Sequence, residues 1–289
     1  MRKLLISTLA TLLIATGYAT PSFADSIPDY PGISKLTRGV ENSAVKKVQQ
    51  ALITLGYPIP VANGTVAIEL IIKAIGIKNR EIILPSNTFF ATIVAVENSG
   101  NIPILVDIEN DSFSVCPNDL RKKISTNTAA LILVHIGGII SSKIEEIIQI
   151  CSENNIELIE DAAHAHLSSY RKQKAGTLGI AGAFSFFPTK VMTTGEGGMI
   201  TTNSEVLYQK IKSLKNFGRD NNNAGIIIND SGNNFKINEF TGLLGYLECQ
   251  RVEKRVKKRN NLIQLYRKEL LNTESKETTE KQNLVFSSR

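Results

Sequence analysis

The sequence predicts an α/β protein in which helices cover both faces of a mostly parallel sheet. Short apolar runs of strand length recur from residue 61 onward, and amphipathic segments of helical length lie between several of them. Strands that alternate with helices in this way favour three layers: helix, sheet and helix. Hydrophobic residues make up 42% of the 289-residue chain and charged residues 21%, so the composition supplies enough apolar material for a large core.

The expected strands share short runs of aliphatic residues, and the expected helices share an apolar stripe at helical spacing. The strands are expected at 81–85, 102–108, 129–136, 156–162, 181–187 and 198–202. The helices are expected at 65–76, 141–155 and 250–271. In the second helix, Ser142 and Glu145 predict a capping box. Ligands of such sheets bind beyond the carboxyl ends of the strands, so candidate functional residues are sought there.

The two ends of the chain depart from this pattern. Residues 1–24 combine a basic start, a short apolar run and a small-residue cleavage site, which predicts a secretory signal peptide. Residues 25–60 are expected to form a linker and a helix capped by Ser43. Within them, residues 36–60 resemble part of a peptidoglycan-binding repeat, although any short amphipathic helix would give the same pattern. The polar residues 272–289 are expected to be disordered.

Charge and cysteine usage limit the classes of partner. The net charge is +6, and much of the excess lies between Arg251 and Arg259. A run of this kind on a helix is typical of a solvated face, so no nucleic-acid partner is predicted. Cys116, Cys151 and Cys249 are too few and too widely spaced for a disulfide framework or a CxxC metal site, and three buried thiols are expected.

Four segments place candidate functional residues at strand ends or helix starts. Asn63–Thr65 precedes a helix, and free N–H groups at a helix start suit a phosphate. Phe89 follows a strand and could lie against a flat ring, with a position in the core as the alternative. Asp161 ends a buried-looking strand, where a carboxylate needs a cation. Ser185 and Lys190 close an aromatic strand just before a glycine-rich turn.

Together these residues meet three chemical needs: a phosphate, a ring with a protonated nitrogen, and an aldehyde that can react with a lysine. Those needs describe pyridoxal phosphate. His164 and His166 lie near Asp161 in the sequence, but His135 is the only other histidine. The sequence does not supply the further ligands that a metal requires, so no metal site is predicted.

An ordered set of motifs carries a family resemblance. The motifs are NGTVAIEL, PSNTFFAT, PILVDI, VHIGG, IEDAAHAH, AGTLG, FSFFPTK, GEGGMITT and GNNFKINEF. From Asn63 to about Leu271 the chain resembles the large domain of the DegT/StrS-type (DegT/DnrJ/EryC) sugar aminotransferases, which are fold-type I pyridoxal-phosphate enzymes. The resemblance implies that residues 61–271 form this large domain and that the cofactor is pyridoxal 5'-phosphate.

The resemblance also implies roles for individual residues around the cofactor ring. Lys190 would be the lysine that binds the cofactor covalently and moves protons, and Asp161 would pair with the ring nitrogen. Phe89 would stack on the ring, and His164 would lie near the ring hydroxyl.

The remaining implied roles concern the cofactor phosphate. Gly64, Thr65 and Ser185 would hold the phosphate. Asn234 would reach the cofactor of a neighbouring subunit, which implies a homodimer.

The implied reaction is the transfer of an amino group from glutamate or a similar donor to a nucleotide-linked keto-sugar. Lysine at position 190 favours amino transfer over the related dehydratase branch, which has histidine there. Two residues depart from the pattern, since Gly137 replaces a usual tyrosine and Ile180 an expected acidic residue. The family's amino-terminal segment and small carboxy-terminal domain are also expected to be missing, so low activity is expected.

Two further hypotheses belong to other classes. The first is an exported, non-catalytic protein that binds cell wall and carries an inherited aminotransferase scaffold. The second is a regulatory protein that binds pyridoxal phosphate without turnover. The predicted signal peptide implies export, whereas pyridoxal phosphate and nucleotide sugars imply the cytoplasm, so the sequence leaves the compartment open.

Overall fold

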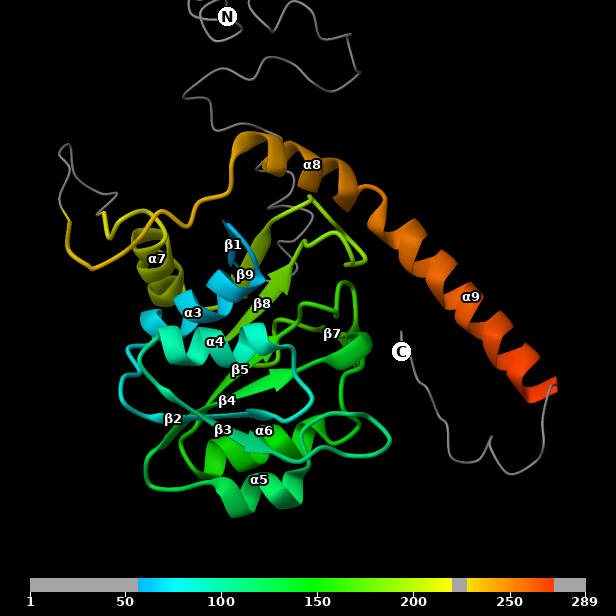
Figure 1. Cartoon of the computed structure of the whole chain (residues 1–289), viewed down its shortest axis with the longest axis horizontal. Helices are drawn as coiled ribbons and strands as arrows, with labels where there is room; N and C mark the ends of the chain where they lie inside the picture. The colour runs from blue at the N-terminus through cyan, green and yellow to red at the C-terminus, as the bar shows by residue number, and fades with distance from the viewer. Residues whose placement is uncertain (1–56, 220–227, 273–289) are drawn as a thin grey trace, which may run out of the picture. The chain divides into compact units, whose positions relative to one another are not determined.

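A seven-stranded sheet organises the described residues, 57–219 and 228–272, of a computed structural model (Figure 1). Its order is β1-β9-β8-β5-β4-β2-β3. Its strands are β1 Tyr57–Val61, β2 Glu81–Pro85, β3 Ile102–Val106, β4 Thr128–Val134, β5 Glu157–Asp161, β8 Ala181–Ser185 and β9 Gly198–Thr202. The pairs from β8 to β3 are parallel, whereas β9 runs antiparallel to both β8 and β1. The prediction of a mostly parallel sheet is confirmed.

All six strands expected from the sequence lie in this sheet, and β1 is a seventh that was not expected. It pairs with β9 from Tyr57 opposite Thr202 to Val61 opposite Gly198. Two of its five residues are proline, which cannot donate to a sheet ladder and is tolerated on an edge strand. Residues 57–60, assigned above to the linker and wall-binding-like segment, therefore belong to the same sheet as the rest of the described chain.

Helices cover the two faces of the sheet, and alternate residues of each strand face one or the other. These helices are α3 Gly64–Ala74, α4 Phe90–Asn98, α5 Pro117–Lys123, α6 Ile144–Glu153 and α7 Glu205–Leu214. On β4, Ala130 and Ile132 pack with α3, α4 and α7, whereas Leu131 and Leu133 pack with α5 and α6. Figure 1 shows α3 and α4 on one side of the sheet and α5 and α6 on the other. The predicted three layers are confirmed.

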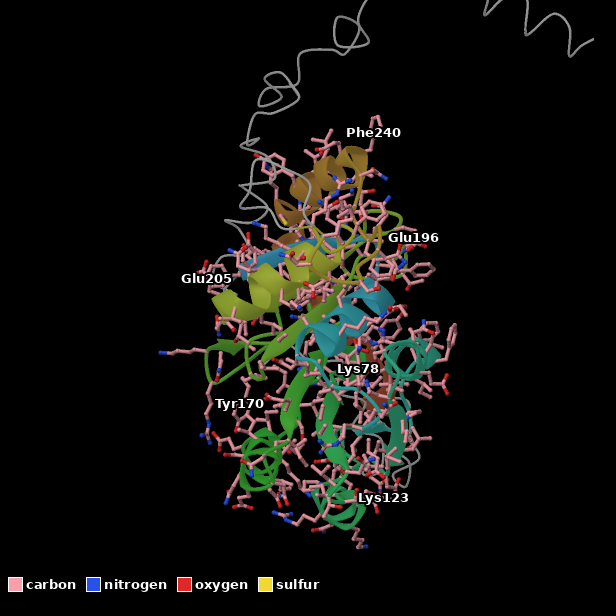
Figure 2. The ribbon with its side chains drawn as sticks, turned by 90° about the vertical axis from the view of Figure 1, so that its left-hand side faces the viewer. Lys78, Lys123, Tyr170, Glu196, Glu205 and Phe240 are labelled. Carbon is pink, nitrogen blue, oxygen red and sulfur yellow. The ribbon has the colours of Figure 1, made fainter. Side chains whose placement is uncertain are left out.

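Two helices follow the sheet, α8 Glu239–Cys249 and α9 Val252–Asn272. The second confirms the long basic helix expected at 250–271, and the first was not expected. Phe240 projects from α8 with 83% of its surface exposed (Figure 2). A short hairpin of β6 Ser169–Tyr170 and β7 Gln173–Lys174 lies apart from the main sheet.

The expected capping box at the start of α6 is wrong. The helix begins at Ile144, and Lys143 occupies its cap position without a side-chain hydrogen bond to the helix. The Ser141 hydroxyl instead accepts a hydrogen bond from the Lys143 N–H at 3.1 Å, which fixes the turn before the helix. Glu145 forms an ion pair with Arg171, so its carboxylate is turned outward rather than back toward Ser142.

A buried carboxylate holds the loop in front of β8 in place. Glu160, on β5, contacts the His135 Nε2 atom at 2.9 Å, and both side chains are fully buried. The same carboxylate accepts backbone N–H groups of Gly176 at 2.7 Å, Leu178 at 2.6 Å and Gly179 at 2.9 Å. One side chain thus satisfies three loop donors that would otherwise be buried without partners.

The predictions for the termini and the cysteines have different outcomes. The predicted signal peptide, residues 25–56 and the tail from 273 onward lie outside the described residues. Within the described ranges, no helix has the length and apolar character needed to cross a bilayer. Cys151 is buried, whereas Cys116 and Cys249 are only partly buried, so the expectation of three buried thiols is right for one of them. All three are free thiols.

We expect Glu160→Gln to lower the free energy of unfolding by about 1–3 kcal/mol. The amide places an NH2 group where the carboxylate accepts backbone N–H groups, so buried donors lose their acceptor. Urea denaturation followed by circular dichroism measures the change. The matched control is Glu157→Gln on the same strand, because Glu157 is exposed. Equal stability of the two variants would contradict this account of the loop.

Candidate functional site

The predicted site residues gather where parallel strands end and helices begin. Parallel strands bring their carboxyl ends to one edge of a sheet, so residues distant in sequence meet there. Those in this position are Gly64 and Thr65 in the first turn of α3, Phe89 before α4, Asp161 at the end of β5, Ser185 at the end of β8, and Lys190 in the loop that follows β8.

Asp161 is a buried carboxylate held at both oxygens. The residue as a whole is only 7% exposed. The Thr92 hydroxyl donates to Oδ2 at 2.9 Å, and the Ala163 N–H donates to Oδ1 at 3.1 Å. The Thr88 and Thr92 hydroxyl oxygens lie 2.7 Å apart, which extends the network toward the start of α4. The carboxylate therefore has a fixed orientation.

Thr88 and Thr92 were not singled out from the sequence. Both lie in the PSNTFFAT segment, in which the sequence pattern indicated only Phe89 as a candidate. The available signal was their spacing, because residues four apart at the start of a helix share one face. The spacing alone could not show that this face lies against the end of β5.

Lys190 lies in the loop after β8, and its backbone N–H donates to the Phe187 carbonyl at 2.9 Å. Burial lowers the pKa of the Lys190 amine, and the negative charge of Asp161 partly offsets that shift. The structure thus brings these two residues close enough for their charges to interact. An amine with a lowered pKa is more often neutral near pH 7, and the neutral form is the nucleophile.

The start of α3 forms a candidate anion site with Ser185. Asn63 caps the helix by accepting the Val66 N–H at 2.9 Å, and no acidic residue lies in the first turn. A Cβ atom added to Gly64 would lie 2.9 Å from the Ser185 Cβ, so glycine permits this close approach. Free backbone N–H groups and the helix dipole favour a negative charge here.

Phe89 presents an aromatic face near the same edge. It is 64% exposed, which excludes the alternative that it is a core residue. Its ring centroid lies 4.1 Å from that of Phe90, and it occupies the cap position of α4 next to Thr88. The ring is therefore available to a ligand.

His164 and His166 have different environments. The His164 Nδ1 atom accepts the Gly137 N–H at 3.2 Å, which leaves the proton on Nε2. Burial lowers the pKa of His164, as does Lys190, whereas Asp161 raises it. His166 is buried against Phe184 and Phe186.

Burial, and then the positive charge of Lys190, lower the pKa of His166 to about 4. The nearby Ser185 backbone favours the protonated form, although neither ring nitrogen makes a hydrogen bond of ordinary geometry within the described residues. His166 is therefore a neutral buried ring at physiological pH.

Asn234 is exposed in the loop before α8. The backbone of this loop is anchored to the rest of the chain, because Asn216 and Asn234 form an isolated bridge and the Phe235 carbonyl accepts the Ala62 N–H at 2.9 Å. The loop thus lies beside the residues that lead into α3, and the Asn234 side chain is accessible.

A profile of the DegT/DnrJ/EryC1/StrS aminotransferase family matches residues 27–287. The chain belongs to this family. The match begins well before residue 61, the start of the domain predicted from the sequence, and it includes β1.

Named relatives and solved structures agree with this assignment. GDP-perosamine synthase of Vibrio cholerae is 33% identical over 217 residues, which are 73% of this chain and 57% of that protein. GDP-perosamine synthase of Caulobacter vibrioides is 35% identical over 212 residues, 72% of this chain and 56% of that protein. The aminotransferase structure from Psychrobacter cryohalolentis has a TM-score of 0.68 at 28% identity, covering 73% of this chain and 56% of that one. The chain spans a little over half the length of these relatives.

We expect His166 to make the stability of the folded protein depend on pH. Its pKa is about 4 in the folded state against an ordinary 6.5, so between these values the unfolded chain binds a proton that the folded chain does not. Stability from this residue is full above pH 6.5 and is lost as the pH falls toward 4. We expect the wild type to lose about 2–3 kcal/mol more than His166→Gln across this range. Urea denaturation at several pH values measures both slopes, and equal slopes would contradict the assignment.

Proposed function

We propose that this chain binds pyridoxal 5'-phosphate and transfers an amino group to a nucleotide-linked keto-sugar. Enzymes of the DegT/DnrJ/EryC1/StrS family depend on this cofactor. One observation carries the proposal. Asp161 is buried, is held by Thr92 and Ala163, and interacts electrostatically with the half-buried amine of Lys190, in the loop after the neighbouring strand β8.

The residues present fit the cofactor at three separate points. The start of α3 with Ser185 suits its phosphate, because Gly64 keeps that space free of a side chain. The fixed Asp161 carboxylate suits a protonated ring nitrogen, since a buried carboxylate needs a cationic partner. Lys190 offers an amine with a lowered pKa, and Phe89 offers an exposed ring face.

When bound, the cofactor supplies an aldehyde for a lysine amine and a ring that withdraws electrons from the reacting carbon. Lys190 Nζ would bind it covalently and then move a proton to and from the substrate carbon. Asp161 would hold the proton on the ring nitrogen, and Thr92 would keep its carboxylate in place. Phe89 would cover one face and exclude water from it. His164 would donate its Nε2 proton toward the ring hydroxyl.

The substrate class rests on the family and its named members. The relatives from Vibrio cholerae and Caulobacter vibrioides are named as synthases of GDP-perosamine. A nucleotide-linked keto-sugar acceptor and a glutamate-type donor follow as proposals for this chain. Because Asn234 is exposed and its backbone is anchored, we also propose that it reaches the cofactor phosphate of a second copy in a homodimer.

Lys190→Ala should abolish covalent attachment of the cofactor without unfolding the protein. The purified protein is incubated with pyridoxal phosphate, reduced with borohydride and analysed by peptide mass spectrometry. We expect a pyridoxyl adduct on Lys190 in the wild type and in the control Lys172→Ala, and none in Lys190→Ala. An adduct on Lys172 or Lys174, with Lys190 unmodified, would show that the assignment is wrong.

Asp161→Asn should weaken cofactor binding moderately and slow the half-reaction with glutamate by about a hundredfold or more. A neutral amide cannot keep the ring nitrogen protonated, so the ring withdraws electrons less strongly. Equilibrium binding and the cofactor absorbance change on adding glutamate give the two measurements. Near wild-type rates in this variant would make Asp161 a structural residue.

The role of Thr92 is tested by a matched pair of variants in the same assays. Thr92→Val removes the hydroxyl that orients Asp161, and Thr92→Ser retains it. We expect the valine variant to resemble Asp161→Asn and the serine variant to resemble the wild type.

A further inference from the structure

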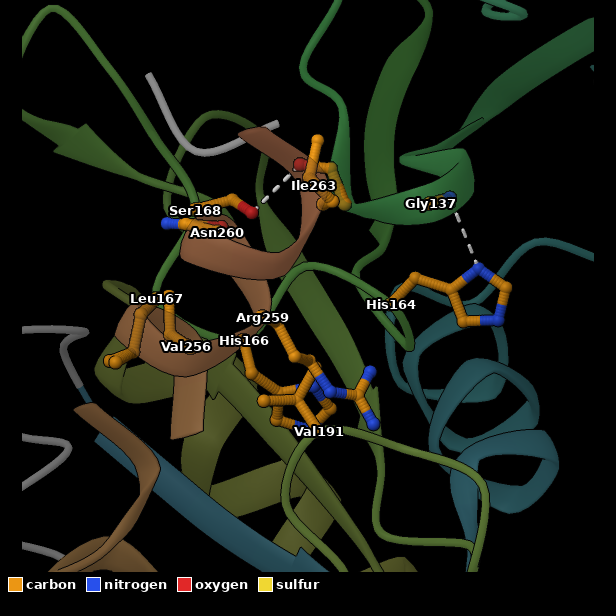
Figure 3. A pocket seen from close by; sticks show the side chains of 11 residues that line it. Gly137, His164, His166, Leu167, Ser168, Val191, Val256, Arg259, Asn260 and Ile263 are labelled. Carbon is orange, nitrogen blue, oxygen red and sulfur yellow. Dashed lines mark hydrogen bonds between the residues drawn. The ribbon is translucent and has the colours of Figure 1, made fainter. Parts of the chain in front are cut away.

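A cavity of about 100 Å³ opens between the proposed active site and α9 (Figure 3). Its wall on the active-site side includes Gly137, His164 and Val191, and its wall on α9 includes Val256 and Arg259. Val191 directly follows Lys190, and the charge of Lys190 acts on His164. The cavity therefore lies next to the amine that is proposed to react.

Arg259 is the cation of this cavity, and its charge is not neutralised within the part of the chain that the structure describes. Arg251 directly precedes α9, and Arg255 and Arg259 lie four residues apart on one face of that helix. The first two both pair with Glu248, Arg251 at 3.8 Å and Arg255 through both terminal nitrogens. Among residues 57–219 and 228–272, no ion pair or hydrogen bond joins Arg259 to a carboxylate.

Arg259 is an exposed residue that lines the cavity from α9. Figure 3 shows Arg259 beside Val191 and His166, with the His164 ring on the opposite side. The charge of Arg259 is one of those that lower the pKa of His166. Within the part of the chain that the structure describes, the lining of the cavity contains no carboxylate and His166 is a neutral buried ring, so Arg259 gives the lining a net positive charge.

We propose that this cavity binds a carboxylate of the amino donor through Arg259. The inference rests on the proposed function, because it assigns the cavity to a substrate of the Lys190 site. A planar guanidinium binds a carboxylate with two parallel hydrogen bonds. The size of the cavity favours one small anionic group, since sites that enclose larger ligands have volumes of about 300–1,000 Å³. The apolar Val191 and Val256 side chains suit the methylene groups of an amino acid.

The test measures binding of glutarate, a dicarboxylate that has no amine to react. Glutarate is titrated calorimetrically into the full-length protein, with and without pyridoxal phosphate. The variants are Arg259→Gln, Arg259→Lys and the control Lys258→Gln, whose exposed side chain is next to Arg259 but does not line the cavity. Loss of a charge-assisted bond should weaken binding about tenfold to a hundredfold in Arg259→Gln.

We expect Arg259→Lys to fall between the wild type and the glutamine variant, and Lys258→Gln to match the wild type. The cofactor absorbance should be the same in all four proteins, which separates this inference from the proposed function. If the cofactor does not bind but glutarate affinity still depends on Arg259, the proposed function fails and the carboxylate subsite stands. Equal glutarate affinity in the wild type and Arg259→Gln, no glutarate binding by the wild type, or tighter binding of inorganic phosphate would each overturn the inference.

Discussion

Two adjacent buried carboxylates at the end of β5 are the constraint on which the site depends. Consecutive strand residues point to opposite faces of a sheet, so Glu160 and Asp161 serve different layers. Glu160 accepts three backbone N–H groups of the loop before β8 and contacts His135. Asp161 accepts from Thr92 on the other side. Glu160 thus fixes the loop before β8, the strand that leads to Lys190. Asp161 supplies the negative charge that interacts with the Lys190 amine.

The second requirement at this edge of the sheet is that the backbone at the start of α3 lies close to the ends of β8 and β9. Gly198 starts β9 against the cap of α3, where an added Cβ would lie 2.5 Å from the Asn63 carbonyl carbon. Gly64 meets Ser185 in a similar way. These glycines let the start of α3 press against the ends of β8 and β9. The candidate phosphate site is therefore a product of sheet packing as well as of a helix start.

The charges around the site form a consistent electrostatic arrangement. Burial holds Lys190 and both nearby histidines toward their neutral forms, and Asp161 is the one anion that opposes this for Lys190 and His164. A positive ring nitrogen at Asp161 and anionic groups at α3 and at Arg259 would each meet a complementary charge. In the proposed function, these complementary positions would let separate segments, on different strands and helices, bind one cofactor and its substrate.

The sequence alone determined the layered α/β fold, six of the seven sheet strands and the positions of Asp161, Ser185 and Lys190, because burial patterns and strand ends are local features. It missed β1, whose two prolines hide an edge strand, and it placed the start of α6 wrongly, because Ser141 rather than Ser142 fixes the preceding turn. Only the tertiary structure decided that Thr92 orients Asp161, that Glu160 binds the loop before β8, and that Arg259 and Val191 line one cavity. Each of these contacts joins residues far apart in the chain, and their meeting depends on strand order and helix packing, which no local pattern encodes.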